Sequence, residues 1–146
     1  MSRIAIVFTP YAVHSELVFT LLNELAQVDS CSIILRRRVL LTRADVEAFY
    51  PKIITRDYFP LIVGCLTGGM AEVIIITTDM LHDVINRIKG MFRYSNGVVL
   101  TTGLRHRYQQ DNHSFEFLLH TTDSDSETDE IGMRLFGEGY SIASRS

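Results

Sequence analysis

The chain has 146 residues, of which 47% are hydrophobic and 21% charged, and its formal net charge is -3 at pH 7. This composition is ordinary for a globular protein, and the length predicts one domain over residues 1–146 with its own buried core. The small negative charge provides no attraction to nucleic acid or to an anionic membrane surface, so we expect neither as a partner.

The apolar runs are too short to cross a bilayer and no signal peptide follows Met1, so a cytoplasmic protein is expected. The two cysteines, Cys31 and Cys65, lack the CxxC or Cys/His spacing of metal ligands. We therefore predict neither a disulfide framework nor a zinc site, and expect core thiols in a reducing compartment.

The first predicted strand is the continuous apolar run from Ile4 to Phe8, which is typical of a strand covered on both faces. Pro10 ends it. Ser15 is a candidate N-cap for a helix in which valine and leucine recur at helical spacing as far as Val28.

The second predicted strand runs from Cys31 to Leu41 and contains the triplet Arg36-Arg37-Arg38. Successive side chains of a strand point to opposite faces, so the triplet places charge on both faces. This pattern favours an edge strand over a central one. Such a strand is either a solvated edge kept from aggregating by its charges or a surface for a partner.

Two short helices are predicted next. Thr42-Arg43-Ala44-Asp45 resembles a capping box and starts a helix that ends at Tyr50, before Pro51. The second helix is expected over Arg56–Leu66, ended by Gly68-Gly69.

A third buried strand is expected over Glu72–Thr77, followed by a helix over Asp79–Lys89. No period is visible from Gly90 to Asn112. A structureless stretch of about 23 residues in a compact domain is more often functional than idle.

The fourth strand is predicted over Phe115–Leu119, and Ser124 or Ser126 caps a last helix to about Phe136. The element order is then β-α-β-(αα)-β-α-β. It predicts an α/β (α+β) fold with a ferredoxin-like, four-stranded antiparallel sheet and an inserted helical hairpin.

His120 follows the fourth predicted strand directly, where a fold can display a nucleophilic or acid-base imidazole. Alternatively, it is simply a histidine at the edge of a strand. Glu130, in the predicted last helix, is a candidate to orient the ring.

An acidic run accompanies this histidine and holds five carboxylates, Asp123, Asp125, Glu127, Asp129 and Glu130. It suits the first turn of a helix, where negative charge complements the macrodipole. A metal-binding cluster and a phosphorylated Ser/Thr switch are the alternatives.

Over about residues 3–140 the chain resembles the nucleoside diphosphate kinase family. Several segments carry the resemblance, in family order and at nearly family spacing: Ile6 to Val13 (I-x-K-P-D-A/G-V), Arg38 to Tyr50, Arg56 to Leu61 (R-P-F-F-x-x-L), Leu104-Arg105 (I-R-G-D-F), His120 to Ser124 (H-G-S-D-S) and Glu130-Ile131 (E-I-x).

The resemblance implies a nucleoside diphosphate kinase type of fold and a ping-pong phosphoryl transfer. His120 would accept the γ-phosphoryl group and Glu130 would orient it. The implied nucleotide-binding residues are Tyr50 beside the terminal phosphate, Tyr58 against the base, and Arg87 (or Lys89), Ser95 and Arg105 on the phosphates. The implied cofactor of an active enzyme is Mg²⁺ with the nucleoside triphosphate, and no protein metal site is expected.

The chain also departs from the family pattern. The lysine before the proline is Thr9, the asparagine three residues before the histidine is Phe117, and the following glycine is Thr121. Losing one charge-assisted hydrogen bond costs roughly 1.5–3 kcal/mol, or one to two decades in rate. His106 and Arg107 are candidates to restore cations to the phosphate site.

These departures favour a divergent kinase-like module, weakly active or inactive, that serves as an interaction or scaffold protein. The alternatives are a working phosphotransferase that carries the phosphoryl group on His120, and a nucleotide-sensing domain without turnover. Expected partners are a nucleotide, other proteins of a larger assembly, or a second copy of the chain. Resemblance to divergent family members implies a cytoskeletal assembly such as the cilium or flagellum axoneme as one location.

Overall fold

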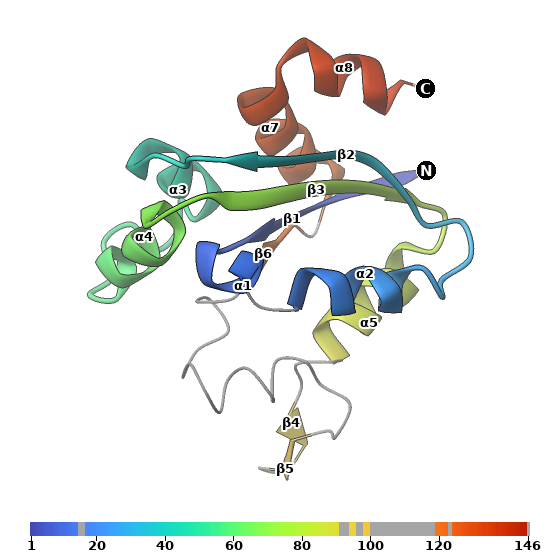
Figure 1. The fold of residues 1–146 in the computed structure, drawn as a ribbon, viewed down its shortest axis with the longest axis horizontal. Coiled ribbons are helices and arrows are strands. Elements are labelled where there is room, and N and C mark those ends of the chain that lie inside the picture. The colour runs from blue at the N-terminus through green and yellow to red at the C-terminus, as the bar shows by residue number, and fades with distance from the viewer. Residues whose placement is uncertain (15–16, 91–93, 96–97, 100–118, 123, 146) are drawn as a thin grey trace.

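The centre of the molecule is a four-stranded antiparallel sheet (Figure 1). Its strands are β1 (Ser2–Phe8), β2 (Ser32–Val39), β3 (Ala71–Thr78) and β6 (Leu119–Thr121), in the order β2-β3-β1-β6. The structure is a computed structural model that describes residues 1–14, 17–90, 94–95, 98–99, 119–122 and 124–145, with the main chain alone at 17, 87, 89, 90, 94, 95, 98 and 99.

The two central strands are those that the sequence marks as apolar on both faces. β1 and β3 pair antiparallel over their full lengths, with Ile4 opposite Ile76 and Val7 opposite Val73. All four of these side chains are buried, because helices cover both faces of the sheet. The predicted ferredoxin-like sheet with antiparallel strands is confirmed.

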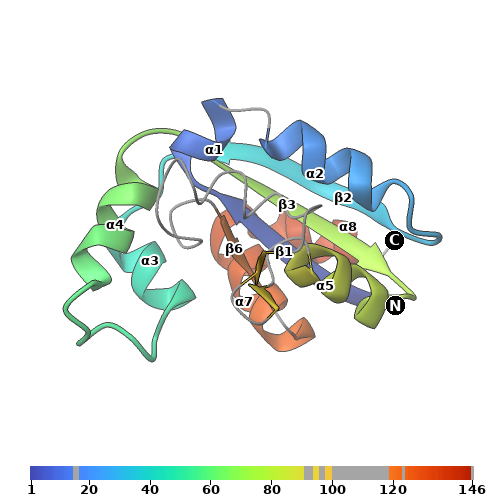
Figure 2. The ribbon, with the colours of Figure 1, turned by 90° about the horizontal axis from the view of Figure 1, so that it is seen from below.

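Helices lie on both faces of the sheet, and the inserted helical hairpin lies towards one end of its strands (Figures 1 and 2). One core cluster joins the sheet to α1 (Pro10–His14), α2 (Leu17–Leu25) and α5 (Leu81–Gly90). The second joins it to α3 (Arg43–Phe49), α4 (Phe59–Thr67), α7 (Asp125–Phe136) and α8 (Glu138–Ser144). None of the described helices is long and apolar enough to cross a membrane.

The inserted helical hairpin is α3 and α4. Thr42 caps α3 with the predicted capping box: its hydroxyl accepts the N–H of Asp45, and the Asp45 carboxylate accepts the N–H of Thr42. The prediction for α4 was wrong by three residues, since the helix begins at Phe59 instead of Arg56. Pro60 explains the difference, because proline lacks an N–H and is favoured in the first helical turn.

Two of the described helices were not predicted from the sequence. α1 begins at Pro10, directly after β1, and α8 follows α7 after Gly137. Gly137 has a φ of 56°, a left-handed conformation that glycine adopts at little cost, and it turns the chain between the two helices. The predicted N-cap of α2, Ser15, lies outside the described residues.

The region around the fourth strand also differs from the prediction. β6 continues past Leu119 through His120 to Thr121, because the ladder to β1 pairs Val7 with His120 and Ile6 with Thr121. The predicted start of this strand at 115–118 lies outside the described residues. The stretch after Gly90, which the sequence predicts to be irregular, contains two short strands, β4 (Tyr94–Ser95) and β5 (Val98–Val99), that pair antiparallel.

β2 lies at one edge of the sheet, as its three arginines predict. Arg36 and Arg38 flank one carboxylate of β3: their Nε atoms lie 2.9 and 3.2 Å from the oxygens of Glu72. Glu72 is only 3% exposed, so the arginines compensate a buried charge. Arg37, on the other face, lies over the Phe136 ring at 5.5 Å from its centroid.

Candidate active site

His120 is held on the face of the sheet that α3 and α7 cover. It pairs with Val7, whose side chain belongs to the core cluster of that face, and residues paired across a ladder point to the same side. The imidazole stacks on Phe49 with planes 8° apart and centroids 5.9 Å apart. The Tyr50 ring lies closer, at 4.4 Å and a tilt of 59°. The C-terminal end of α3 therefore fixes the imidazole plane.

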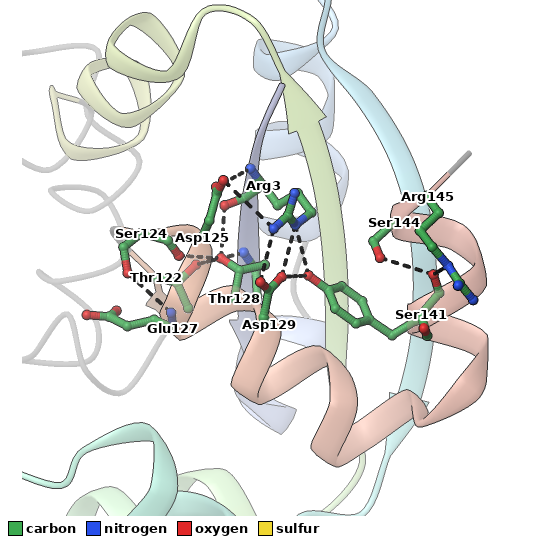
Figure 3. Close-up of polar contacts among 12 residues, drawn as sticks. Arg3, Thr122, Ser124, Asp125, Glu127, Thr128, Asp129, Ser141, Ser144 and Arg145 are labelled. Atoms are coloured by element: carbon green, nitrogen blue, oxygen red, sulfur yellow. Dashed lines mark hydrogen bonds and ion pairs between the residues drawn. The ribbon is translucent and has the colours of Figure 1, made fainter.

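α7, which carries the acidic run from Asp125 onwards, is attached to β1 by Arg3 (Figure 3). The Arg3 guanidinium donates from Nε and Nη2 to the two oxygens of Asp129, at 2.9 and 3.0 Å. The Arg3 backbone N–H donates to Asp125 at 2.8 Å. The Tyr140 hydroxyl of α8 donates to Asp129 as well. Two carboxylates of the run thus serve the fold.

Charge and burial shift the pKa values of Asp129 and Tyr140. The hydrogen bond from Arg3 lowers the pKa of Asp129 below its ordinary value. Burial, together with the hydrogen bond to Asp129, raises the pKa of Tyr140 to about 12. The carboxylate is therefore charged and the phenol neutral at physiological pH, which suits the hydrogen bond between them.

Buried threonines connect the turn after β6 to the start of α7 (Figure 3). The hydroxyls of Thr122 and Thr128 lie 2.6 Å apart, and the Ala5 N–H donates to the Thr122 hydroxyl at 2.8 Å. Of the two predicted caps, Ser124 and Ser126, it is Ser124 that caps α7, with its hydroxyl accepting the Glu127 N–H at 3.2 Å. These bonds place the first turns of α7 beside His120.

A cavity of about 270 Å³ lies between α3, β6 and α7. His120, Tyr50 and Glu130 line it, so the structure brings together three of the predicted site residues. Two further charged residues in its wall were missed by the sequence reasoning, Lys52 and Glu127. Lys52 belongs to no recognisable motif, and the sequence marks Glu127 only as a member of the acidic run.

Thr9, which occupies the position of the family's lysine, has a different role. Its side chain is fully buried at the end of β1. Its hydroxyl accepts the backbone N–H of Ala12 at 3.3 Å, and its carbonyl accepts the N–H of Val13 at 3.0 Å. Thr9 therefore caps the first turn of α1.

The other predicted nucleotide-binding residues are not placed in this cavity. Tyr58 lies at the N-terminus of α4 with 48% of its surface exposed and is absent from the described cavity wall. The side chains of Arg87 and Ser95, and the alternative Lys89, lie outside the described residues, as do Arg105, His106, Arg107 and Phe117. Within the described part of the chain, no three His, Cys, Asp or Glu side chains are grouped so as to hold a metal ion.

No protein-family model and no curated protein matches this sequence. Solved structures do match the fold. The apo nucleoside diphosphate kinase from Encephalitozoon cuniculi is similar with a TM-score of 0.73 at 15% identity, over 94% of this chain and 90% of that chain. A nucleoside diphosphate kinase family protein from Babesia bovis gives 0.68 at 13% identity, over 94% and 90%.

A third similar structure, the halophilic nucleoside diphosphate kinase from Halobacterium salinarum in complex with CDP, gives a TM-score of 0.66 at 11% identity, over 88% of this chain and 85% of that chain. Identities this low establish the fold alone. The chain has the ferredoxin-like α/β fold of the nucleoside diphosphate kinases.

Proposed function

We propose that this protein is a divergent nucleoside diphosphate kinase-like module that binds a Mg²⁺-bound nucleoside triphosphate at the His120 cavity and transfers its γ-phosphoryl group slowly. The observation that supports it is the shared cavity of His120, Glu130 and Tyr50, in which the imidazole is held by two aromatic rings. A nucleophile held in one orientation lowers the entropic cost of the reaction.

In the proposed reaction, an imidazole nitrogen of His120 forms a bond to the γ-phosphorus while the bond to the β–γ bridging oxygen breaks. The nucleoside diphosphate leaves with the electron pair. A second nucleoside diphosphate then takes the phosphoryl group from phosphohistidine, which restores the neutral imidazole. Glu130 is proposed to orient the ring for both halves.

Slow transfer is expected because polar groups of the resembled family are missing. Thr9 is buried and caps α1, so it supplies no positive charge to a phosphate. Phe117 has no polar group for the sugar. A loss of one to two decades for each of these two groups would lower the rate by about two to four decades if the losses add.

The test is incubation with Mg²⁺ and γ-labelled ATP, followed by detection of an acid-labile phosphohistidine. We expect slow labelling of the wild type and none of His120→Ala. His82→Ala is the matched control, because His82 is an exposed histidine on α5 outside the described cavity wall. Nucleotide binding without label would establish the sensing role instead, and absence of nucleotide binding would refute the proposal.

A second proposed function is that of an interaction or scaffold protein that docks through β2. It is supported by the position of β2 at the sheet edge and by Ile33, which is 49% exposed there. Asp125 and Asp129 already engage Arg3, so an acidic surface of another protein fits the arginines better than this run on a second copy. A cytoskeletal or axonemal location rests on the family resemblance alone.

Arg37→Glu tests this second role while sparing Arg36 and Arg38, whose charges serve the buried Glu72. The variant is expected to lose partners that the wild type retains in pull-downs from native assemblies, or to lose self-association in light scattering. Identical behaviour of the variant and the wild type in both assays would contradict docking through β2.

A further inference from the structure

Lys52 lies in the wall of the His120 cavity, at a position that carries no motif. It follows α3 in a turn closed by a hydrogen bond from the Ile53 N–H to the Tyr50 carbonyl at 3.2 Å. Pro51 occupies the second position of this turn, where its fixed φ is favoured, and Lys52 occupies the third. The lysine is therefore presented by a stiff segment of backbone.

The same turn is tied to the residues that hold the imidazole. The Tyr50 N–H donates to the Val46 carbonyl at 3.0 Å, which anchors the turn to α3, and the Tyr50 ring contacts that of His120. Beyond the turn, the Arg56 N–H donates to the Ile53 carbonyl at 2.9 Å. Tyr50 thus couples the position of the Lys52 backbone to that of the His120 ring.

The charged residues of the cavity wall indicate which kind of ligand Lys52 can bind. Lys52 is the one lysine or arginine among the described residues that line it, together with the acidic Glu127 and Glu130. Lys52 is exposed, and it takes part in no ion pair found among the described residues. A polyphosphate that enters a cavity whose wall also holds two carboxylates needs cationic partners, and an ammonium group with three donors is well suited to phosphate oxygens.

We propose that Lys52 binds the terminal phosphate of the nucleotide beside His120, an inference that rests on the proposed nucleotide site. It supplies from the turn after α3 the positive charge that Thr9 does not supply from the end of β1. The ligand class is a nucleoside di- or triphosphate, and the lysine recognises its terminal phosphate, not its base.

The test is calorimetric binding of Mg²⁺-ATP, Mg²⁺-ADP and adenosine to the wild type, Lys52→Gln, Lys52→Arg and Arg56→Gln. Arg56 is an exposed cation in the same loop but outside the described cavity wall, so its variant controls for the loss of one charge. Lys52→Gln is expected to lower ATP affinity by about 10- to 100-fold, since one charge-assisted hydrogen bond is lost. Lys52→Arg should keep most of the affinity.

Adenosine affinity distinguishes a phosphate contact from a change in the shape of the site. It should stay within about twofold in Lys52→Gln, as should ATP affinity in Arg56→Gln, because surface changes away from a contact have small effects. Equal losses for ATP and adenosine, or an unchanged ATP affinity in Lys52→Gln, would overturn the role of Lys52 while leaving the nucleotide site intact. A wild type that binds none of the three ligands would overturn the proposed function itself.

Discussion

The hydroxyl oxygen of Thr9 lies 3.3 Å from the backbone nitrogen of Ala12 and accepts its N–H. This bond satisfies one of the donors that the first turn of a helix leaves without an intrahelical partner. The position that carries a lysine in the resembled family has thus become a structural cap in this chain. The lysine in the described wall of the His120 cavity is instead Lys52.

Thr9→Ala is expected to lower the free energy of unfolding by about 1–2 kcal/mol, because it removes the cap and leaves a small void in a buried position. Thr9→Ser keeps the accepting oxygen, so its free energy of unfolding should fall by less than that of Thr9→Ala. Urea denaturation of both variants measures the difference, and equal losses would show that the hydroxyl contributes nothing.

Arg36 and Arg38 are expected to act together on the free energy of unfolding. Each single change to alanine leaves Glu72 one guanidinium, whereas the double change leaves a buried carboxylate without either. The double variant should therefore lose more than the sum of the single losses, by about 1–3 kcal/mol. Urea denaturation of the wild type, the two single variants and the double variant tests this prediction. Arg37→Ala is the control, and strict additivity would contradict the prediction.

Gly132 in α7 is expected to tolerate no side chain. A Cβ atom there would lie 2.4 Å from the nearest ring atom of Tyr140, so alanine forces the ring away from Asp129. Gly132→Ala should lower stability by about 1–3 kcal/mol, as overpacking does. Gly64→Ala is the matched control in α4, where no atom lies within 4 Å of the new Cβ. It should raise stability by about 0.5–1 kcal/mol.

Acid should weaken the attachment of α7. The lowered pKa of Asp129, caused chiefly by Arg3, means that its charged form stabilises the fold above the ordinary carboxyl pKa near 3.9. That contribution is lost as the pH falls through the lower pKa of the folded state. The stability difference between the wild type and Asp129→Asn should therefore shrink below about pH 4. A constant difference from pH 7 to pH 2 would contradict this assignment.

Alkali should have a corresponding effect through Tyr140. Its pKa is raised to about 12 in the folded protein, so the neutral phenol stabilises the fold fully below the unfolded value near 10. This contribution disappears between about pH 10 and pH 12. Denaturation of the wild type and Tyr140→Phe across that range should show the two stabilities converging. Parallel curves would show that the phenol titrates at an unshifted pKa.

The sequence by itself determined the features that depend on local preferences. The apolar runs of β1 and β3 required strands covered on both faces, and the Thr42–Asp45 spacing required a helix start. Three adjacent arginines favoured an edge position for β2, which the sheet order confirms. These predictions succeeded because each depends on contacts within a few residues or on the two-residue period of a strand.

Tertiary structure decided which distant side chains meet. Only the folded chain places Arg3 of β1 against Asp129 of α7, 126 residues later, and buries Glu72 between two arginines of another strand. The ladder between β6 and β1 set how far β6 extends past Leu119 and which face His120 takes. Spacing along the chain carries no information on such pairings.

The same distinction holds for the candidate site. His120, Glu130 and Tyr50 were expected from the resemblance to the nucleoside diphosphate kinase family, and all three line one cavity. Lys52 was not, because a lysine in a turn has no periodicity or motif of its own. Its relation to His120 arises from the packing of α3 against the sheet, which brings the end of that helix beside a strand some 70 residues further along the chain.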